Sequence, residues 1–461
     1  MSVPAPFPVE PADAPRVLGP LPGLRSRAEL EAQSDVFYPG LTHGSYPFVA
    51  ARKRGWLVED LDGNVLVDLV SASASVPFGA GRRDLVEVAA EQLLEFGNED
   101  SHAVTNPLMS RLAQRLVQAA PASLTRVDLA LNGTEAVETA VKLMRRATGR
   151  RLILGFYGGY HGESTTTAAL GAEHHGISLG VRGLGGGFVH VPYPNSFRSP
   201  FGPPRPGGTG DSTVDFVRDH LLFHAVDPAE VAGVVIEPVL GSGGVVVPPD
   251  SFWRALEELC AEHGWLLCLD EVKTGFGRSG HLFAAEIAQL RPDLMCLGKA
   301  MGGGVMPIGA VLGSEAVLGT FDDVSTGSTW AWLPAACAVA LRTLDILETE
   351  GVLDNVRQLH VVAREVLDPL VEQYEQVGDV RVQGCFVGIE LVSNKSTKDR
   401  DPELQSRVAA AILARGVLVD SSTASINIQP SLVMDGESLR SALWLVRAAI
   451  DDVLGRERDR R

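Results

Sequence analysis

Three apolar stretches decide the fold: Val231-Ala-Gly-Val-Val-Ile-Glu237, Trp265-Leu-Leu-Cys-Leu-Asp270 and Leu294-Met-Cys-Leu-Gly298. Each is short and almost continuously apolar, which is typical of a strand that is buried on both faces of a sheet. A helical pattern from Pro249 to His263 lies between the first and the second stretch. Strands that alternate with helices predict an α/β domain with a mainly parallel sheet covered by helices.

The same alternation extends toward the N-terminus. Helices are expected at Asp84 to Phe96, Leu108 to Ala120 and Thr134 to Thr148, and strands at residues 127–131 and 151–156. Further upstream, apolar and polar residues alternate on both sides of Asp62-Gly63, which predicts a β-hairpin. Residues 171–213 are rich in Gly and Pro and have no clear periodicity, so we expect a long loop over an active site.

These patterns divide the chain into four segments. The proline-rich and acidic residues 1–35 are expected to form an extended or disordered arm, and residues 36–83 the N-terminal part of a small domain. Residues 84–335 would form the large domain. Past residue 336, a long helix and the strand-like Cys385-Phe-Val-Gly-Ile-Glu-Leu-Val predict the C-terminal part of a smaller α+β domain, residues 336–461.

Composition excludes several classes of function. The formal net charge of -17 opposes binding to nucleic acid or to an anionic membrane, and no dense basic patch offsets it. The five cysteines form no Cys-x-x-Cys pair, and no spaced set of His, Asp and Glu indicates a metal site. The N-terminus lacks the features of a signal peptide, and no apolar run reaches membrane-spanning length. We therefore expect a cytoplasmic protein without a metal.

Two charged residues follow neighbouring strands. Asp270 ends one apolar stretch, and Lys299 comes directly after the next, beside the three glycines 302–304. Carboxyl ends of parallel strands meet at one edge of a sheet, where active sites form. Pyridoxal 5′-phosphate (PLP) needs a lysine for its aldehyde and an acid for its pyridine nitrogen. The pair predicts a PLP enzyme in which Lys299 forms the Schiff base and then moves a proton.

A phosphate site is expected where Asn132-Gly133-Thr134 joins a strand to a helix. Backbone N–H groups at the start of a helix bind anions, and the Thr134 hydroxyl could add a further bond. Taken alone, this segment fits an ordinary helix cap and turn equally well. Tyr160, in Gly158-Gly-Tyr-His-Gly, fits either a core residue or a ring that stacks on a planar cofactor.

The chain resembles a class III aminotransferase of PLP fold type I from about residue 45 to its C-terminus. The resemblance rests on Asn132-Gly-Thr-Glu-Ala, Tyr160-His-Gly, Val235-Ile-Glu-Pro-Val, Leu269-Asp-Glu-Val-Lys-Thr-Gly-Phe-Gly-Arg, Gly298-Lys-Ala-Met-Gly-Gly-Gly-Val-Met-Pro-Ile-Gly-Ala, and Gly327-Ser-Thr-Trp with Pro334-Ala-Ala-Cys-Ala. Several long motifs in the same order make it specific. It implies a seven-stranded, mainly parallel sheet in the large domain, flanked by helices.

The resemblance also implies a role for each residue of the site. Lys299 is the Schiff-base lysine, Asp270 the partner of the pyridine nitrogen, and Gly133 and Thr134 are phosphate ligands. Tyr160 and Val272 lie on the two faces of the ring. Thr329 reaches the phosphate bound by a neighbouring subunit, so a homodimer with shared active sites is expected.

The residues that bind a substrate carboxylate in many relatives are missing. Asn427 stands where an arginine of the small domain is common, Glu163 follows the Tyr-His-Gly motif where another arginine often occurs, and Ser242 replaces a glutamate. Lys273 is an unusual second amine next to the Asp-Glu-Val motif, and it could bind a substrate anion or point into solvent. The amino donor and acceptor therefore stay open.

Three reactions fit these residues. The first is transfer of an amino group from a small amine or amino acid to a keto acid through a pyridoxamine form of the cofactor. The second is isomerisation by an aminomutase or an amino-acid epimerase, because residues 144–162 also resemble glutamate-semialdehyde aminomutases. The third and weakest is a decarboxylating aminotransferase, because Ser242-Gly-Gly resembles dialkylglycine decarboxylase. Retention of Lys299 and Asp270 opposes a non-catalytic binding protein, and Gly183 to Gly187 precedes a strand rather than the helix that a dinucleotide site requires.

Overall fold

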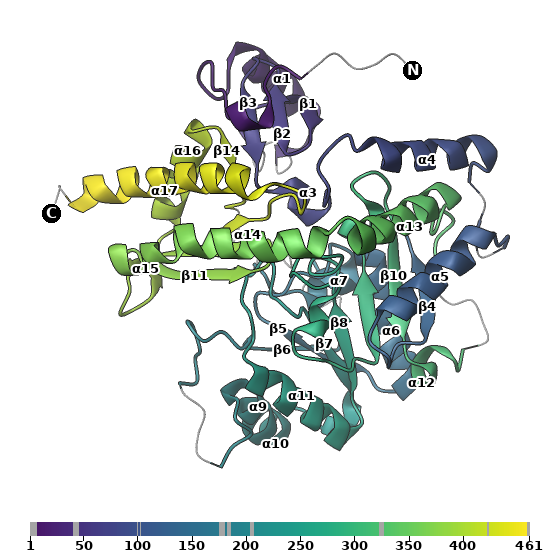
Figure 1. The fold of residues 1–461 in the computed structure, drawn as a ribbon. Helices are drawn as coiled ribbons and strands as arrows, with labels where there is room; N and C mark the ends of the chain where they lie inside the picture. Colours follow the sequence, from purple (N-terminus) through teal and green to yellow (C-terminus); the bar gives the residue numbers. More distant parts are fainter. Residues whose placement is uncertain are drawn as a thin grey trace. The chain divides into compact units, whose positions relative to one another are not determined.

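The computed structural model describes residues 7–39, 46–98, 100–101, 103–174, 180–181, 186–202, 207–321, 327–421 and 424–458. Contacts divide the chain into two compact units, one of Met1–Arg82 with Asn355–Arg461 and the other of Arg83–Asp354. Figure 1 labels most of the helices and strands of both units. Among the described residues, no helix is long and apolar enough to cross a membrane.

A seven-stranded sheet forms the centre of the unit Arg83–Asp354, in the order β4-β10-β9-β8-β7-β5-β6. Its strands are β4 (Arg126–Ala130), β5 (Leu152–Phe156), β6 (Phe188–Val191), β7 (Val231–Ile236), β8 (Leu266–Asp270), β9 (Leu294–Leu297) and β10 (Gly309–Gly313). Neighbours from β6 to β9 pair in parallel, whereas β10 runs antiparallel to both β9 and β4. The expected seven-stranded, mainly parallel sheet is confirmed.

Helices occur between the strands and at both ends of this unit. They are α4 (Arg83–Glu95), α5 (Pro107–Ala119), α6 (Gly133–Thr148), α7 (Thr165–Leu170), α9 (Ser212–Phe216), α10 (Leu222–His224), α11 (Asp250–His263), α12 (Glu315–Leu318) and α13 (Pro334–Thr349). Shorter turns occur at Val217–Leu221, Pro228–Glu230, Ala284–Glu286 and Lys299–Gly302. The helices expected near residues 84–96, 108–120, 134–148 and 249–263 are all present, with ends that differ by one residue.

Helix α6 shows why the sequence produces these elements. The side chain of Asn132 accepts a hydrogen bond from the backbone N–H of Glu135 and so caps the first turn. Gly149 ends the helix in the left-handed conformation, with a φ of 69°. The apolar residues of one helix face, such as Val137 and Met144, are buried against the sheet, where they join Val235 of β7 in one core cluster.

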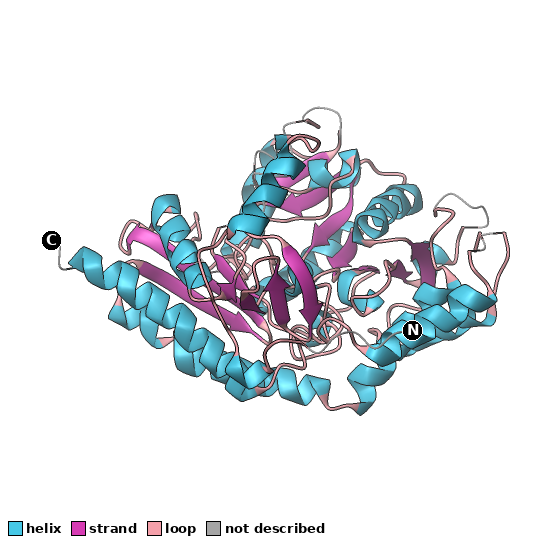
Figure 2. Cartoon of the chain, turned by 90° about the horizontal axis from the view of Figure 1, so that it is seen from above, coloured by secondary structure: helices cyan, strands magenta, loops and turns pink. Residues whose placement is uncertain are grey.

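The second unit contains two smaller sheets. Strands β1 (Ala50–Arg54), β2 (Leu57–Asp60), β3 (Val65–Asp68) and β14 (Val417–Leu418) form one, and β11 (Val377–Gln383), β12 (Phe386–Asn394), β13 (Asp399–Arg400) and β15 (Ile426–Ile428) form the other. Its helices are α1 (Leu24–Ser34), α3 (Ser71–Ala74), α14 (Val352–Leu367), α15 (Pro369–Gln373), α16 (Pro402–Ala414) and α17 (Gly436–Arg458). Figure 2 shows α17 as a long helix that leads to the C-terminus.

The predicted hairpin around Asp62-Gly63 is present, because β2 and β3 pair antiparallel across it. A carboxylate oxygen of Asp60 accepts hydrogen bonds from the backbone N–H groups of Asp62 and Asn64, which closes the turn. Residues 7–35 are not simply an extended arm. Leu24–Ser34 is the helix α1, and its first turn is held because the Asp62 carboxylate binds the backbone N–H groups of Arg25 and Ser26.

Helix α3 is an unusual element of this unit. Its residues Ser71, Ala72, Ser73 and Ala74 have φ angles of 49°, 49°, 55° and 68°, so they form a left-handed turn. Each residue with a Cβ atom adopts this conformation at a cost of roughly 1–2 kcal/mol. The Asp68 carboxylate helps to hold the turn by accepting hydrogen bonds from the backbone N–H groups of Val70 and Ser71.

Candidate active site

One cavity collects most of the predicted site residues. It has a volume of about 150 Å³ and is lined by Asn132, Gly133, Thr134, Tyr160, His161, Gly162, Asp270, Val272 and Lys299. All of these residues belong to the unit Arg83–Asp354. Asp270 is the last residue of β8 and Lys299 follows β9, so they lie at the carboxyl ends of two neighbouring parallel strands.

Asp270 is held in place by two contacts. Its Oδ1 atom accepts a hydrogen bond from the backbone N–H of Val272, at 3.0 Å. Its Oδ2 atom lies 2.7 Å from Nδ1 of His161, and both side chains are buried. Burial opposes protonation of His161, but the hydrogen bond and the charge of Asp270 outweigh it and raise the pKa of His161 above its usual value. His161 therefore holds the Asp270 carboxylate in position in the cavity.

Lys299 begins a short turn after β9 and has a positive φ of 42°. Burial lowers the pKa of its amine, although the carboxylates of Asp270, Glu237 and Glu173 act in the opposite direction. A lysine that forms a Schiff base must react as the neutral amine, which a lowered pKa makes more accessible. The environment of Lys299 therefore suits this chemistry.

The first turn of α6 provides the expected place for an anion. Gly133 begins the helix, and a Cβ atom at this position would lie only 2.4 Å from Cγ1 of Val272. A Cβ atom on Gly162 would lie 2.5 Å from Oγ1 of Thr134. Glycines at these positions let the side chains of Val272 and Thr134 pack closely around the N-terminal end of α6, which is the end of the helix dipole that attracts negative charge. This cradle fits a phosphate group.

Two further glycines bring the neighbouring loops together. A Cβ atom on Gly298, after β9, would lie 3.1 Å from the backbone N and Cα atoms of Gly133. Gly309 begins β10, and a Cβ atom there would lie 2.6 Å from the carbonyl oxygen of Asn132. The loops after β4 and β9 therefore pack against each other and against the start of the reversed strand between them.

Tyr160 is positioned through both of its ends. Its backbone N–H donates a hydrogen bond to Oε1 of Glu237 at 3.0 Å, and its hydroxyl donates one to Oε1 of Glu163 at 3.1 Å. Glu237 is buried, which raises its pKa, and its other oxygen accepts a hydrogen bond from the backbone N–H of Gly241. Glu163, which stands where relatives often carry an arginine, thus fixes the phenol of Tyr160.

Lys273 is buried, with only 8% of its surface exposed, so it does not point into solvent. A Cβ atom on Gly241 would lie 2.7 Å from Cδ of Lys273 and 3.2 Å from Oε2 of Glu237. Lys273 does not line the cavity. The neighbouring Glu271 supports the fold, because its carboxylate accepts hydrogen bonds from the Thr274 hydroxyl and from the backbone N–H groups of Ala284 and Ala285.

The structure adds one residue and separates another. The sequence assigned no role to His161, although this residue belongs to the Tyr-His-Gly motif. The one feature that could have indicated a role is its position directly after Tyr160, which is expected to stack on the ring. Thr329 is exposed and does not line the cavity, while its neighbour Ser328 donates a hydrogen bond to Glu135 of α6. Its expected contact with a second subunit stays a prediction.

Comparisons with known proteins identify the family of this chain. The family model "Aminotransferase class-III" matches residues 41–450. The alanine/serine racemase of Pyrococcus horikoshii is 31% identical over 95% of this chain and 93% of its own. The 4-aminobutyrate aminotransferase of Mycobacterium tuberculosis is 30% identical over 95% of this chain and 98% of its own.

Solved structures extend the likeness to the fold. An amine transaminase from an uncultivated Pseudomonas species, in a PLP-bound form, has a TM-score of 0.83 and 30% identity over 91% of this chain and 97% of its own. An (S)-enantioselective omega-transaminase from Thermomicrobium roseum has a TM-score of 0.84 and 29% identity, over 93% of this chain and 98% of its own. The chain belongs to the class III aminotransferase family, whose fold type I enzymes work with PLP.

Proposed function

We propose that this enzyme moves an amino group between a small amine or amino acid and a keto acid, with Lys299 as the residue that binds PLP. The observation that carries the proposal is that Lys299, Asp270 and the first turn of α6 line one cavity. A lysine, an acid and an anion cradle are the three groups that PLP requires. When bound, PLP takes up the electrons released as a bond at the substrate Cα breaks.

The protein residues would bind and orient the cofactor and move the proton. Asp270 would keep a proton on the pyridine nitrogen, with His161 holding the carboxylate in place. Gly133 and Thr134 would bind the phosphate, and Tyr160 and Val272 would cover the two faces of the ring. Lys299 would accept the proton from the substrate Cα as a general base.

Absorbance of the purified holoenzyme tests the role of Lys299. We expect a visible band from the lysine-bound cofactor in the wild type and in the control Lys142→Ala, which removes an exposed lysine of α6. The band should be absent in Lys299→Ala. A band of unchanged position and intensity in Lys299→Ala would overturn the assignment.

Transfer itself is tested with one amino donor in the absence of a keto acid. The cofactor absorbance should then change once, with release of one carbonyl product per active site, and added pyruvate or 2-oxoglutarate should restore it. A panel of donors is needed, because Asn427, Glu163 and Ser242 stand where relatives carry carboxylate-handling groups. No change with any donor would contradict transfer.

Racemisation or epimerisation is a second candidate, supported by relatives. Besides the alanine/serine racemase, an isoleucine 2-epimerase of Lentilactobacillus buchneri is 30% identical over 88% of this chain and 91% of its own. Single L-amino acids in deuterium oxide, without any keto acid, would distinguish the reactions. Catalytic formation of the other stereoisomer, with deuterium at Cα, favours isomerisation, whereas a single stoichiometric turnover favours transfer.

We also propose a cytoplasmic homodimer with shared active sites. The buried thiols support a reducing compartment, since Cys268 and Cys296 share a hydrogen bond of 3.8 Å between their sulfur atoms and form no disulfide. The exposed Thr329, and Trp330 with 56% of its surface exposed, support a subunit contact. Sedimentation would give the oligomeric state, and Thr329→Ala should weaken PLP binding only if a second subunit contributes this hydroxyl.

A further inference from the structure

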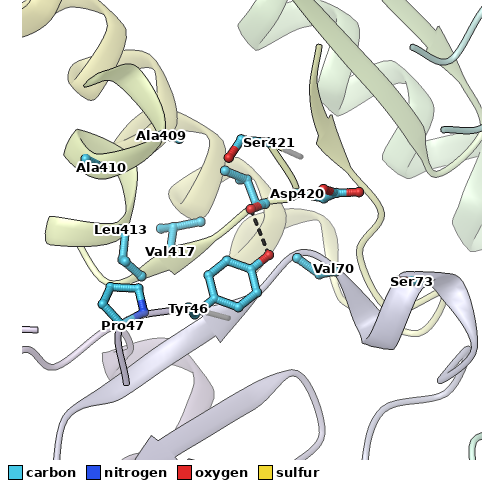
Figure 3. A pocket seen from close by; sticks show the side chains of 11 residues that line it. Tyr46, Pro47, Val70, Ser73, Ala409, Ala410, Leu413, Val417, Asp420 and Ser421 are labelled. Atoms are coloured by element: carbon cyan, nitrogen blue, oxygen red, sulfur yellow. Dashed lines mark hydrogen bonds between the residues drawn. The ribbon is translucent and has the colours of Figure 1, made fainter. Parts of the chain in front are cut away.

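A second cavity lies within the unit Met1–Arg82 and Asn355–Arg461. It has a volume of about 580 Å³, which falls within the range of small-molecule sites. Figure 3 shows the residues that line it: Tyr46, Pro47, Val70, Ser73, Ala409, Ala410, Leu413, Val417, Val419, Asp420 and Ser421. Tyr46 and Pro47 precede β1, and Val70 and Ser73 lie just before and in the left-handed turn α3. The other residues belong to α16 and to the segment that begins at β14.

Most of the lining is apolar. Helix α16 contributes Ala409, Ala410 and Leu413, and the segment after it contributes Val417 and Val419. The Tyr46 hydroxyl donates a hydrogen bond to the carbonyl oxygen of Val419, at 2.9 Å. Because of this bond, drawn as a dashed line in Figure 3, the phenol hydrogen of Tyr46 is not available as a donor to a ligand. The lining therefore favours a ligand with an apolar body.

Asp420 gives the cavity its charge. Among the described residues that line it, Asp420 is the one with a formal charge. Two backbone hydrogen bonds with Asn427, of 3.0 and 2.7 Å, fix the position of Asp420 in the chain. Asp420 and Tyr46 line the same cavity, and burial, followed by the charges of Asp420 and Asp68, raises the pKa of the Tyr46 phenol. A carboxylate beside an apolar lining complements a cation.

We propose that this cavity binds a protonated amine with an apolar body, held by the Asp420 carboxylate. The hydroxyls of Ser73 and Ser421 line the same cavity and could accept further N–H bonds. This cavity shares no lining residue with the cavity of Lys299, so the ligand is a separate amine that regulates the enzyme rather than its amino donor. The proposal concerns binding alone and does not rest on the proposed transfer reaction.

Calorimetry on the holoenzyme tests the charge preference. N,N-dimethylhexylamine is the probe, because a tertiary amine is protonated at neutral pH and cannot form a Schiff base with PLP. Hexan-1-ol and hexanoate are its neutral and anionic counterparts. We expect the amine to bind and the other two to bind at least about tenfold more weakly, since a hydrogen bond to a charged group contributes that much. Equal binding of all three would overturn the proposal.

Two variants test the place of binding. Asp420→Asn keeps the size of the side chain and should weaken amine binding about tenfold or more. The control is Glu403→Gln, which removes an exposed carboxylate of the lining helix α16 at a position outside the cavity. Ala410→Phe should block binding by filling the cavity, whereas Ala414→Phe adds the same ring at an exposed position of α16 outside it. Unchanged binding in both Asp420→Asn and Ala410→Phe would refute this site.

Steady-state kinetics tests whether the amine acts apart from the amino donor. N,N-dimethylhexylamine should change kcat without competing with the donor, and Asp420→Asn should remove this effect. Competition with the donor that persists in Asp420→Asn would place the amine at the Lys299 cavity instead and would overturn the proposal.

Discussion

The Nδ1 atom of His161 lies 2.7 Å from the Oδ2 atom of Asp270, and the two side chains are 1% and 4% exposed. A carboxylate accepts hydrogen bonds only, so the ring nitrogen is the donor. Because water does not reach this pair, the charge of Asp270 acts at close range on whatever occupies the cavity. His161 is thus a positioning residue for the acid that we assign to the pyridine nitrogen.

Replacing His161 by Phe should lower kcat by about 10- to 100-fold while PLP stays bound, because one hydrogen bond to a buried charged group is lost. His161→Gln should restore part of the activity through its amide N–H. The cofactor's visible absorbance, titrated with pH, should also shift its midpoint in His161→Phe. His190→Gln, which alters a half-buried histidine of β6, is the control for stability alone. A normal kcat in His161→Phe would rule out the positioning role.

Tyr160→Phe and Tyr160→Ala should separate the ring from its hydroxyl. The Phe variant loses only the hydrogen bond to Glu163, so the PLP dissociation constant should change less than about threefold. The Ala variant also loses the ring face, and PLP should bind about tenfold more weakly. Fluorescence titration of the apoenzyme with PLP measures both values. Equal weakening in the two variants would argue that Tyr160 acts through its hydroxyl.

Gly133→Ala should damage cofactor binding more than folding. Its Cβ atom would collide with Val272, whose side chain is a predicted cover of the PLP ring. Displacing Val272 should weaken PLP binding by about 5- to 150-fold, because overpacking costs about 1–3 kcal/mol. Gly19→Ala is the matched control, since a Cβ atom there has no heavy atom within 4 Å. The PLP dissociation constant and the free energy of unfolding of the apoenzyme are measured for both variants. Similar dissociation constants in Gly133→Ala and Gly19→Ala would contradict the prediction.

Glu271 should make stability depend on pH. Burial raises its pKa from an ordinary value of 4.5 to about 7 in the folded protein. The folded state then binds more protons than the unfolded state between these values, so the free energy of unfolding falls by about 3 kcal/mol as pH rises from 4.5 to 7. Urea unfolding at several pH values should show this decline in the wild type and in the control Glu258→Gln. A decline of equal size in Glu271→Gln would exclude Glu271 as its source.

The sequence predicted what depends on local pattern. Apolar runs such as residues 231–236 and 266–270 became strands of the expected sheet, and Asp62-Gly63 became the turn of the expected hairpin. Lys299 and Asp270 were found because each follows a strand, and strand ends converge at one edge of a parallel sheet. The family comparison confirms the fold and the cofactor, and the individual roles of the site residues stay predictions.

What escaped prediction depends on contacts between distant residues. His161 and Asp270 are 109 positions apart, and no periodicity indicates which loop meets which. The burial of Lys273 beside Gly241 has the same cause. The left-handed turn at Ser71–Ala74 escaped for another reason, because serine and alanine carry no signal for positive φ and the surrounding structure imposes it.

The packing of Gly133, Gly298 and Gly309 has a consequence for how this enzyme can be recombined. Strand β10 starts where β4 and β9 end, so the three glycines occupy one layer although they are far apart in the chain. A larger residue at any one of them would have to be matched by altered backbone at the others. A chimera that takes residues 298–309 from a relative should therefore also take residues 132–133 from the same parent, because the two segments pack directly against each other.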